Sequence, residues 1–143
     1  MDAERIIRAI VDWAEAKPTI RAVAVVGSYA RGTARADSDI DLVLLTTNPD
    51  RFRADTAWLD AIAWHAIGAQ PMKWEDEDYG KLWSRRLWLE RNAGEVEFGF
   101  AQPSWADNNP IDPGTRRVIA DGCRILHDPE NMLSRLCTAI SSR

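Results

Sequence analysis

The chain is poor in the residues that most often bind transition metals. It has two cysteines and two histidines among 143 residues. Neither Cys123 nor Cys137 lies in a cluster with metal-ligand spacing, and His65 and His127 are isolated, which argues against a His/Cys metal site. The two cysteines could pair in principle, but in a cytoplasmic protein of this size we expect two reduced, partly buried thiols.

Long hydrophobic runs are also missing. Runs such as residues 22–26 and 42–45 are far too short to span a bilayer. The first ten residues, MDAERIIRAI, carry charges between their apolar residues and so lack the continuous apolar core of a signal peptide. We therefore expect a cytoplasmic protein with no membrane partner.

The sequence has no excess of positive charge. Its 18 Lys and Arg residues are outnumbered by 22 Asp and Glu residues, for a formal net charge of −4. A stable, non-specific grip on nucleic acid needs a basic surface, so nucleic acid is not the expected partner, whereas a small nucleotide is not excluded. The length fits one domain with one core, residues 1–143.

Hydrophobic patterning in the first half of the chain alternates between helix and strand. Ile6, Ile7, Ile10, Val11 and Ala14 fall on one helical stripe, and Pro18 ends that helix. The next elements are expected in the order strand, short helix or turn, strand and helix, over residues 19–28, 29–36, 39–47 and 52–67.

The second half has no strict alternation of strand and helix. Residues 75–78 form an acidic run without a clear period, for which we expect a solvated loop. Residues 82–103 read as a hairpin whose arms meet at the turn of residues 92–94. A strand over 123–127 lies between helices expected after Asp112-Pro113 and Asp128-Pro129. The pattern predicts an α/β (α+β) fold, a mixed β-sheet of about five strands covered by helices.

Carboxylates on two of the expected strands could meet. Asp39 and Asp41 share one face of their strand because side chains alternate along it. Glu97 lies between two apolar neighbours, which suggests an acid at the surface of a half-buried strand, whereas Glu95 beside the turn is expected to be solvated. If the two strands are adjacent, three carboxylates converge, as a site for two divalent cations such as Mg²⁺ requires.

Gly27-Ser28 at the end of the preceding strand could cradle a phosphate. Glycine lets the backbone approach a ligand closely, the Ser28 hydroxyl can donate to a phosphate oxygen, and a following short helix presents free N–H groups. Arg31 could neutralise phosphate charge, and Arg35 and Ser38 are weaker candidates. Taken singly, each of these features is typical of an ordinary turn, but their order along the chain is more specific.

Gly27-Ser28, a ten-residue spacer and Asp39-Ile40-Asp41 together resemble the signature of the DNA polymerase beta-like nucleotidyltransferase superfamily. Within it, the chain is most similar to the minimal nucleotidyltransferases, which are related to the antibiotic nucleotidyltransferases. The motif core covers residues 23–45, and Val96-Glu97-Phe98 supplies the third element. The third acid is Glu97 where the commoner pattern has Asp.

The resemblance implies a role for each of these residues. Gly27 and Ser28 would hold the triphosphate of an NTP, with ATP as the expected one. Asp39 and Asp41 would bind two Mg²⁺ ions, and Glu97 would complete the metal site and help to deprotonate an acceptor hydroxyl. The NMP group would pass in line to a small molecule or a protein, with release of pyrophosphate.

The sequence is compatible with two other functions. Minimal nucleotidyltransferases are often encoded beside helical toxins, so the chain could be an antitoxin-like module that modifies or masks such a partner. It could also be a non-catalytic nucleotide-binding domain. Because the chain is short, a second copy or a helical partner protein could supply cleft walls, to which Trp74 and Trp105 could add. The acidic run could attract a cationic acceptor such as an aminoglycoside.

Overall fold

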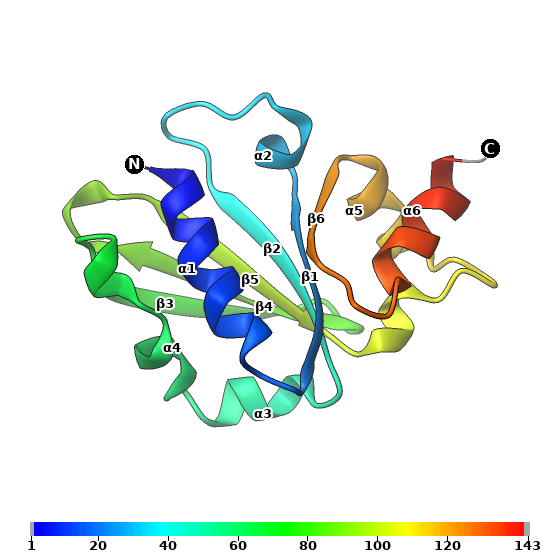
Figure 1. Ribbon diagram of the computed structural model, residues 1–143, viewed down its shortest axis with the longest axis horizontal. Coiled ribbons are helices and arrows are strands. Elements are labelled where there is room, and N and C mark those ends of the chain that lie inside the picture. The colour runs from blue at the N-terminus through cyan, green and yellow to red at the C-terminus, as the bar shows by residue number, and fades with distance from the viewer. Residues whose placement is uncertain (1, 142–143) are drawn as a thin grey trace.

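A computed structural model describes residues 2–141 and contains one mixed sheet (Figure 1). Its strands are β1 (Ile20–Val26), β2 (Ile40–Thr46), β3 (Pro71–Asp78), β4 (Leu82–Leu89), β5 (Glu95–Ala101) and β6 (Cys123–His127). They are ordered β3-β4-β5-β2-β1-β6. The β2–β5 pair is parallel, and the other neighbouring pairs are antiparallel. The α+β class and the mixed sheet are as predicted, with six strands in place of about five.

The helices are short apart from the first. They are α1 (Ala3–Glu15), α2 (Ser28–Arg31), α3 (Pro49–Ala54), α4 (Trp58–Ala61), α5 (Pro113–Ala120) and α6 (Met132–Ser141), with 3-10 turns η1 (Trp64–Ala66), η2 (Glu90–Asn92) and η3 (Pro103–Ala106). Within residues 2–141, no helix combines the length and the apolar character that crossing a membrane requires.

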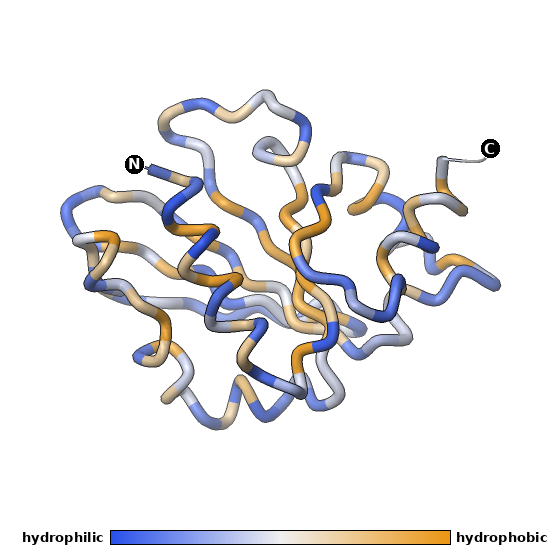
Figure 2. Tube along the Cα trace, in the orientation of Figure 1, coloured by the Kyte–Doolittle hydropathy of each residue, from blue (hydrophilic) through white to orange (hydrophobic). Residues whose placement is uncertain are grey.

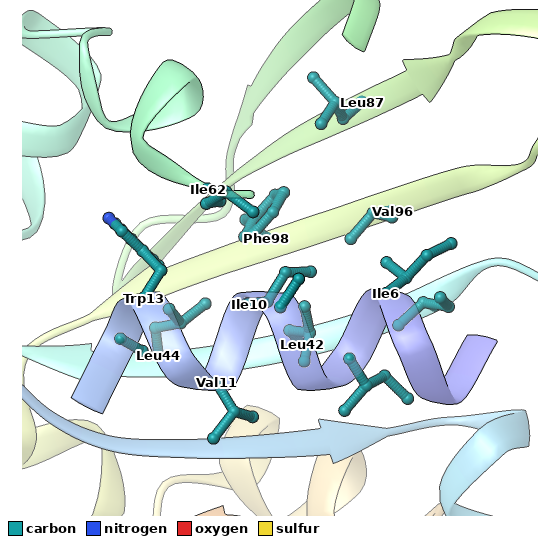
Figure 3. Close-up of a cluster of buried hydrophobic side chains, with 14 of the residues drawn as sticks. Ile6, Ile10, Val11, Trp13, Leu42, Leu44, Ile62, Leu87, Val96 and Phe98 are labelled. Atoms are coloured by element: carbon teal, nitrogen blue, oxygen red, sulfur yellow. The ribbon is translucent and has the colours of Figure 1, made fainter. Parts of the chain in front are cut away.

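One face of the sheet is covered by α1, which crosses it in front of the strands in Figure 1. The predicted stripe of α1 is buried, and Ile6, Ile10 and Trp13 point into a cluster that includes Leu42 and Phe98 (Figure 3). Asp2 caps this helix by accepting a hydrogen bond from the amide of Arg5. An amphipathic helix packed on the alternating apolar side chains of a sheet accounts for this first core.

The opposite face carries a second, smaller core. Leu133 and Leu136 of α6, Ile119 of α5 and Trp105 of η3 pack against the other face of β1 and β2. In Figure 2 the central strands are largely orange, whereas blue segments predominate in the loops around them. The α5 helix begins as predicted, with the Asp112 carboxylate accepting from the amides of Gly114 and Thr115.

Residues 52–67 do not form the single predicted helix. The backbone becomes extended at Asp55 and at Ile62, so the segment breaks into the end of α3, α4 and η1. Trp58, Leu59 and Trp64 are all buried, and the indoles of Trp58 and Trp64 donate to nearby carbonyls of the same segment. A straight helix could not turn all these side chains toward one core, so tertiary packing prevails over helix propensity.

Two other local predictions were wrong. The acidic run is not a loop but the second half of the edge strand β3, which pairs with β4 over residues 71–78. The last helix does not start at Pro129 but at Met132. Asp128 nevertheless caps that helix at a distance, because its carboxylate accepts from the amides of Leu133 and Ser134.

The register brings one end of three strands together. Val26, the last residue of β1, is opposite Asp41, the second residue of β2. Because β2 and β5 are parallel, Asp41 also lies beside Glu97, near the start of β5. The turn after β1 and the first residues of β2 and β5 therefore meet at one edge of the sheet.

Candidate active site

Three carboxylates converge at this edge, because the strands β2 and β5 are adjacent. Asp41 and Glu97 are direct neighbours in the β2–β5 register, and Asp39 lies just before β2. The side chains of Asp39 and Glu97 are 33% and 25% exposed, so solvent or a ligand can still reach them. All three belong to the sheet face that α1 does not cover, because the alternate residues Ile40 and Leu42 belong to the first core.

An arginine that the sequence analysis missed stands among these acids. Arg86 lies on β4 directly opposite Glu97. Its Nη1 atom donates to Asp39 at 2.5 Å and to Glu95 at 2.9 Å, and its Nη2 atom donates to Glu97 at 2.6 Å. Glu95, expected to be solvated, is thus half-buried and ion-paired. Counting across the predicted turn of residues 92–94 would have placed Leu89 opposite Glu97. The actual connection is longer, residues 90–94 with η2, and this shifts the register so that Arg86 is the cross-strand partner of Glu97.

Burial and charge perturb Asp41 strongly. Desolvation, followed by the charges of Glu97 and Asp39, raises the pKa of Asp41 to about 6 against the opposing charge of Arg86. The hydrogen bonds of Arg86 go to the other three carboxylates, and Asp41 is not among its partners. Asp41 is therefore the carboxylate whose negative charge is least compensated.

Arg86 responds to the same cluster in the opposite sense. Burial alone would lower the pKa of its guanidinium, but hydrogen bonds to Asp39 and Glu95, with the charges of Glu97 and Asp39, outweigh burial and raise it. A guanidinium is protonated at any physiological pH. Arg86 therefore supplies a permanent positive charge among these acids.

Gly27 fits against Asp41. It has φ +75° and ψ −149°, a conformation almost restricted to glycine. A Cβ atom at this position would lie 2.9 Å from Oδ2 of Asp41, so only glycine lets the backbone pass this close to the carboxylate. Ser28 follows as the first residue of α2 and is half-buried.

The other predicted phosphate ligands already have protein partners. Arg31 lies next to this turn, but its guanidinium donates to the carboxylate of Asp121 at 2.7 Å and to the Asp121 carbonyl at 2.9 Å. The hydroxyl of Ser38 accepts from the amide of Arg35 and closes the loop before β2. Arg31 is placed beside Gly27-Ser28, whereas Ser38 serves a turn.

The tryptophans proposed for a cleft do not line the carboxylate edge. Trp105 is 5% exposed and borders a cavity of about 880 Å³ at the other end of the sheet, between the end of β5 and the start of α3. Trp74 is exposed on β3. The carboxylates do not line that cavity, so its size is no evidence for the chemistry of this edge.

The ligand atoms at this edge are of the type that binds a hard divalent cation. Asp39, Asp41 and Glu97 offer the carboxylate oxygens that Mg²⁺ prefers, and the uncompensated charge at Asp41 favours a cation. In their present rotamers, no three Asp, Glu, His or Cys side chains of residues 2–141 are grouped so that they could hold a metal ion. Two of the three carboxylates are bonded to Arg86 instead.

Most of the chain, and not only this edge, resembles a known protein family. The family model for a nucleotidyltransferase domain matches residues 5–119. No curated protein matches the chain. A solved structure described as "Crystal structure of the toxin-antitoxin with AMP-PNP" is similar over 99% of this chain and 86% of its own, with 13% identity and a TM-score of 0.47.

Proposed function

This chain belongs to the nucleotidyltransferase domain family, and we propose that it moves an NMP group from an NTP to a hydroxyl of a small molecule or a protein. One observation carries the proposal. The parallel β2–β5 pair puts Asp41 beside Glu97 while Gly27 lies against Asp41. A close backbone approach for a triphosphate and a cluster of acids for cations are the two parts that such a transfer needs.

Asp39, Asp41 and Glu97 would hold Mg²⁺ at this edge. When bound there, Mg²⁺ would neutralise charge on the triphosphate and favour in-line attack at phosphorus. The role of Asp41 would be the most direct, because it lies between Gly27 and Glu97 and lacks a hydrogen bond from Arg86. Binding a cation would offset both the burial and the repulsion from Glu97 and Asp39 that raise the pKa of Asp41.

Gly27 and Ser28 would bind the triphosphate, with ATP as the expected nucleotide. Ser28 could donate its hydroxyl to a phosphate oxygen, and Arg31 would add charge if it left Asp121. Glu97, which is 25% exposed, would accept the proton of the acceptor hydroxyl. The contribution of the protein is thus positioning and neutralisation of charge.

Incubation with each of the four NTPs, Mg²⁺ and pools of hydroxyl acceptors, followed by mass spectrometry, tests the proposal. We expect pyrophosphate release and an acceptor whose mass gain identifies the nucleotide. Asp39→Ala and Asp41→Ala should reduce transfer by at least about a hundredfold, whereas Asp60→Ala on the exposed side of α4 should not. NTP binding without turnover and without dependence on Mg²⁺ would instead support a non-catalytic domain.

A glycine pair tests the cradle. Gly27→Ala should strongly weaken NTP binding, because the new methyl group would push against Asp41 Oδ2. Gly32→Ala is the control for a methyl group at a nearby glycine of positive φ, since Gly32 has φ +75° and ψ +21° and a Cβ atom there would meet nothing within 4 Å. Equal NTP affinity in the two variants, measured by titration calorimetry, would argue against a nucleotide at Gly27.

A further inference from the structure

Arg86 is bonded to the carboxylates that the proposed function assigns to a metal. Its guanidinium donates one hydrogen bond to a carboxylate oxygen of each of Asp39, Glu95 and Glu97, at 2.5, 2.9 and 2.6 Å. The side chain is 35% exposed, so it is neither a core residue nor a free surface residue. A single planar group with several N–H donors thus joins acids from β5 and from the loop before β2.

The charges at this edge are far from balanced. Asp39, Asp41, Glu95 and Glu97 face one guanidinium, and Asp41 receives no hydrogen bond from it. Like charges at such short range repel strongly where solvent is partly excluded. Arg86 therefore keeps the cluster together while no other cation is present.

A divalent cation and Arg86 would compete for the same oxygens. Ligation by Asp39 and Glu97 would require lone pairs that now accept from Arg86. The positive charges of Arg86 and of a divalent cation bound to the same carboxylates would also repel each other. Glu95 is the partner of Arg86 that lies outside the proposed ligand set, so Arg86 could keep that ion pair when it gives up the other two.

We propose that Arg86 is a built-in counter-ion, which holds Asp39 and Glu97 in the metal-free protein and moves onto Glu95 when a divalent cation binds. This inference rests on the proposed metal site. It makes Arg86 a positioning residue that sets the affinity for the cation, and it makes Glu95 the residue that retains Arg86 at the edge of the site.

Binding of Mn²⁺ to the full chain, followed by electron paramagnetic resonance in the absence of nucleotide, tests this competition. Arg86→Gln should bind Mn²⁺ about tenfold more tightly than the original protein, because the competing ion pairs are gone. Arg21→Gln is the control. It removes the same charge and breaks the two hydrogen bonds that Arg21 donates to Glu130, a carboxylate outside the cluster. It should leave Mn²⁺ affinity unchanged.

Arg86→Lys distinguishes the effect of hydrogen bonds to the carboxylate oxygens from the effect of the positive charge of residue 86. Lysine keeps the positive charge but cannot bond to three acids in the geometry of a guanidinium. If Arg86 acts by occupying the oxygens, Arg86→Lys should also bind Mn²⁺ more tightly than the original protein. If Arg86→Lys binds as the original protein does, long-range charge alone accounts for the effect and the inference is overturned.

Glu95→Gln gives a second, opposite test that does not depend on the folding of Arg86→Gln. Without Glu95, Arg86 has only Asp39 and Glu97 to bond, so Mn²⁺ affinity should fall several-fold. In the double variant with Arg86→Lys this loss should shrink, because the two residues act through one contact. Equal losses in both backgrounds would overturn the role given to Glu95.

The outcomes also separate this inference from the function on which it rests. If the original protein binds no Mn²⁺, with or without an NTP, the metal site itself is wrong. If it binds Mn²⁺ but neither Arg86 variant binds more tightly, the site stands and the competition is overturned. Thermal unfolding adds a readout without activity: Arg86→Gln should melt lower than the original protein, and Mn²⁺ should restore most of the difference.

Discussion

The ionised carboxylate of Asp41 destabilises the folded chain at neutral pH. Its pKa is raised to about 6 by burial and by the charges of Glu97 and Asp39, whereas an unfolded Asp titrates near 4. Below about pH 4 the carboxyl group is protonated in both states. Between pH 4 and 6 the unfolded chain loses this proton first, so the free energy of unfolding falls as the pH rises.

Asp41→Asn should therefore stabilise the metal-free protein at neutral pH. Two pKa units correspond to about 3 kcal/mol, and partial solvent access reduces the expected gain to about 2 kcal/mol. Urea unfolding at pH 7.5 should show the gain, and unfolding below pH 4 should show almost none. Asp60→Asn removes a charge outside the cluster and serves as the control. A gain of equal size at both pH values would mean that ionisation of Asp41 is not its source.

One acidic residue of the edge strand β3, Asp76, forms an ion pair with a buried arginine. Arg85 of β4 is 2% exposed and stacks near the rings of Trp58, Trp74 and Trp83. Its charge is balanced by Asp76, which accepts two hydrogen bonds at 2.7 and 2.9 Å. The strand is thus fastened to the first core through one ion pair as well as through its pairing with β4.

Asp76→Ala should be strongly destabilising. It leaves the guanidinium of Arg85 buried without a counter-ion, for which a loss of about 3–5 kcal/mol is typical. Glu75→Ala, one residue earlier and exposed on the other face of the strand, should change the free energy of unfolding by less than about 0.5 kcal/mol. Urea unfolding of both variants compares them, and similar losses would contradict a special role for Asp76.

Prediction from the sequence succeeded for elements whose evidence is local. The alternation at the start of residues 39–47 and the glycine turn after β1 predict a strand and a turn from neighbouring residues alone, whereas the place of Glu97 beside Asp41 depends on the pairing of distant strands. The strand β3 was missed because acidic residues have low strand propensity, and its cause, the buried Arg85, lies across a turn. The broken segment over residues 52–67 likewise follows from packing, which no local pattern reports.

At the scale of the whole molecule, the two cores share their central strand. Ile40, Leu42 and Leu44 of β2 belong to the first core, whereas Val43 and Leu45 belong to the second. Because side chains of one strand alternate between the faces, neither core can lose β2 without disrupting the other. We therefore expect the domain to unfold as one unit.

Leu44→Ala and Leu136→Ala test this coupling from the two sides of the sheet. Both leucines are fully buried, so each change should lower the free energy of unfolding by about 2–5 kcal/mol. Tryptophan fluorescence reports mainly on the first core, which contains Trp13, Trp58, Trp64 and Trp83, and far-ultraviolet circular dichroism reports on the whole sheet. The two transitions should coincide in both variants. Separate midpoints in Leu136→Ala would show that the second core unfolds alone.

The parallel pair β2–β5 has a consequence for the timing of synthesis. The 48 residues 47–94 separate the end of β2 from the start of β5. A chain still emerging from the ribosome therefore exposes the Gly27-Ser28 turn, Asp39 and Asp41 well before Arg86 and Glu97 have been made. Closing so long a connection is a slow step in folding. The acidic edge can form only after β5 has been made, so a chain truncated before β4 would present two neighbouring aspartates with neither their third acid nor their arginine.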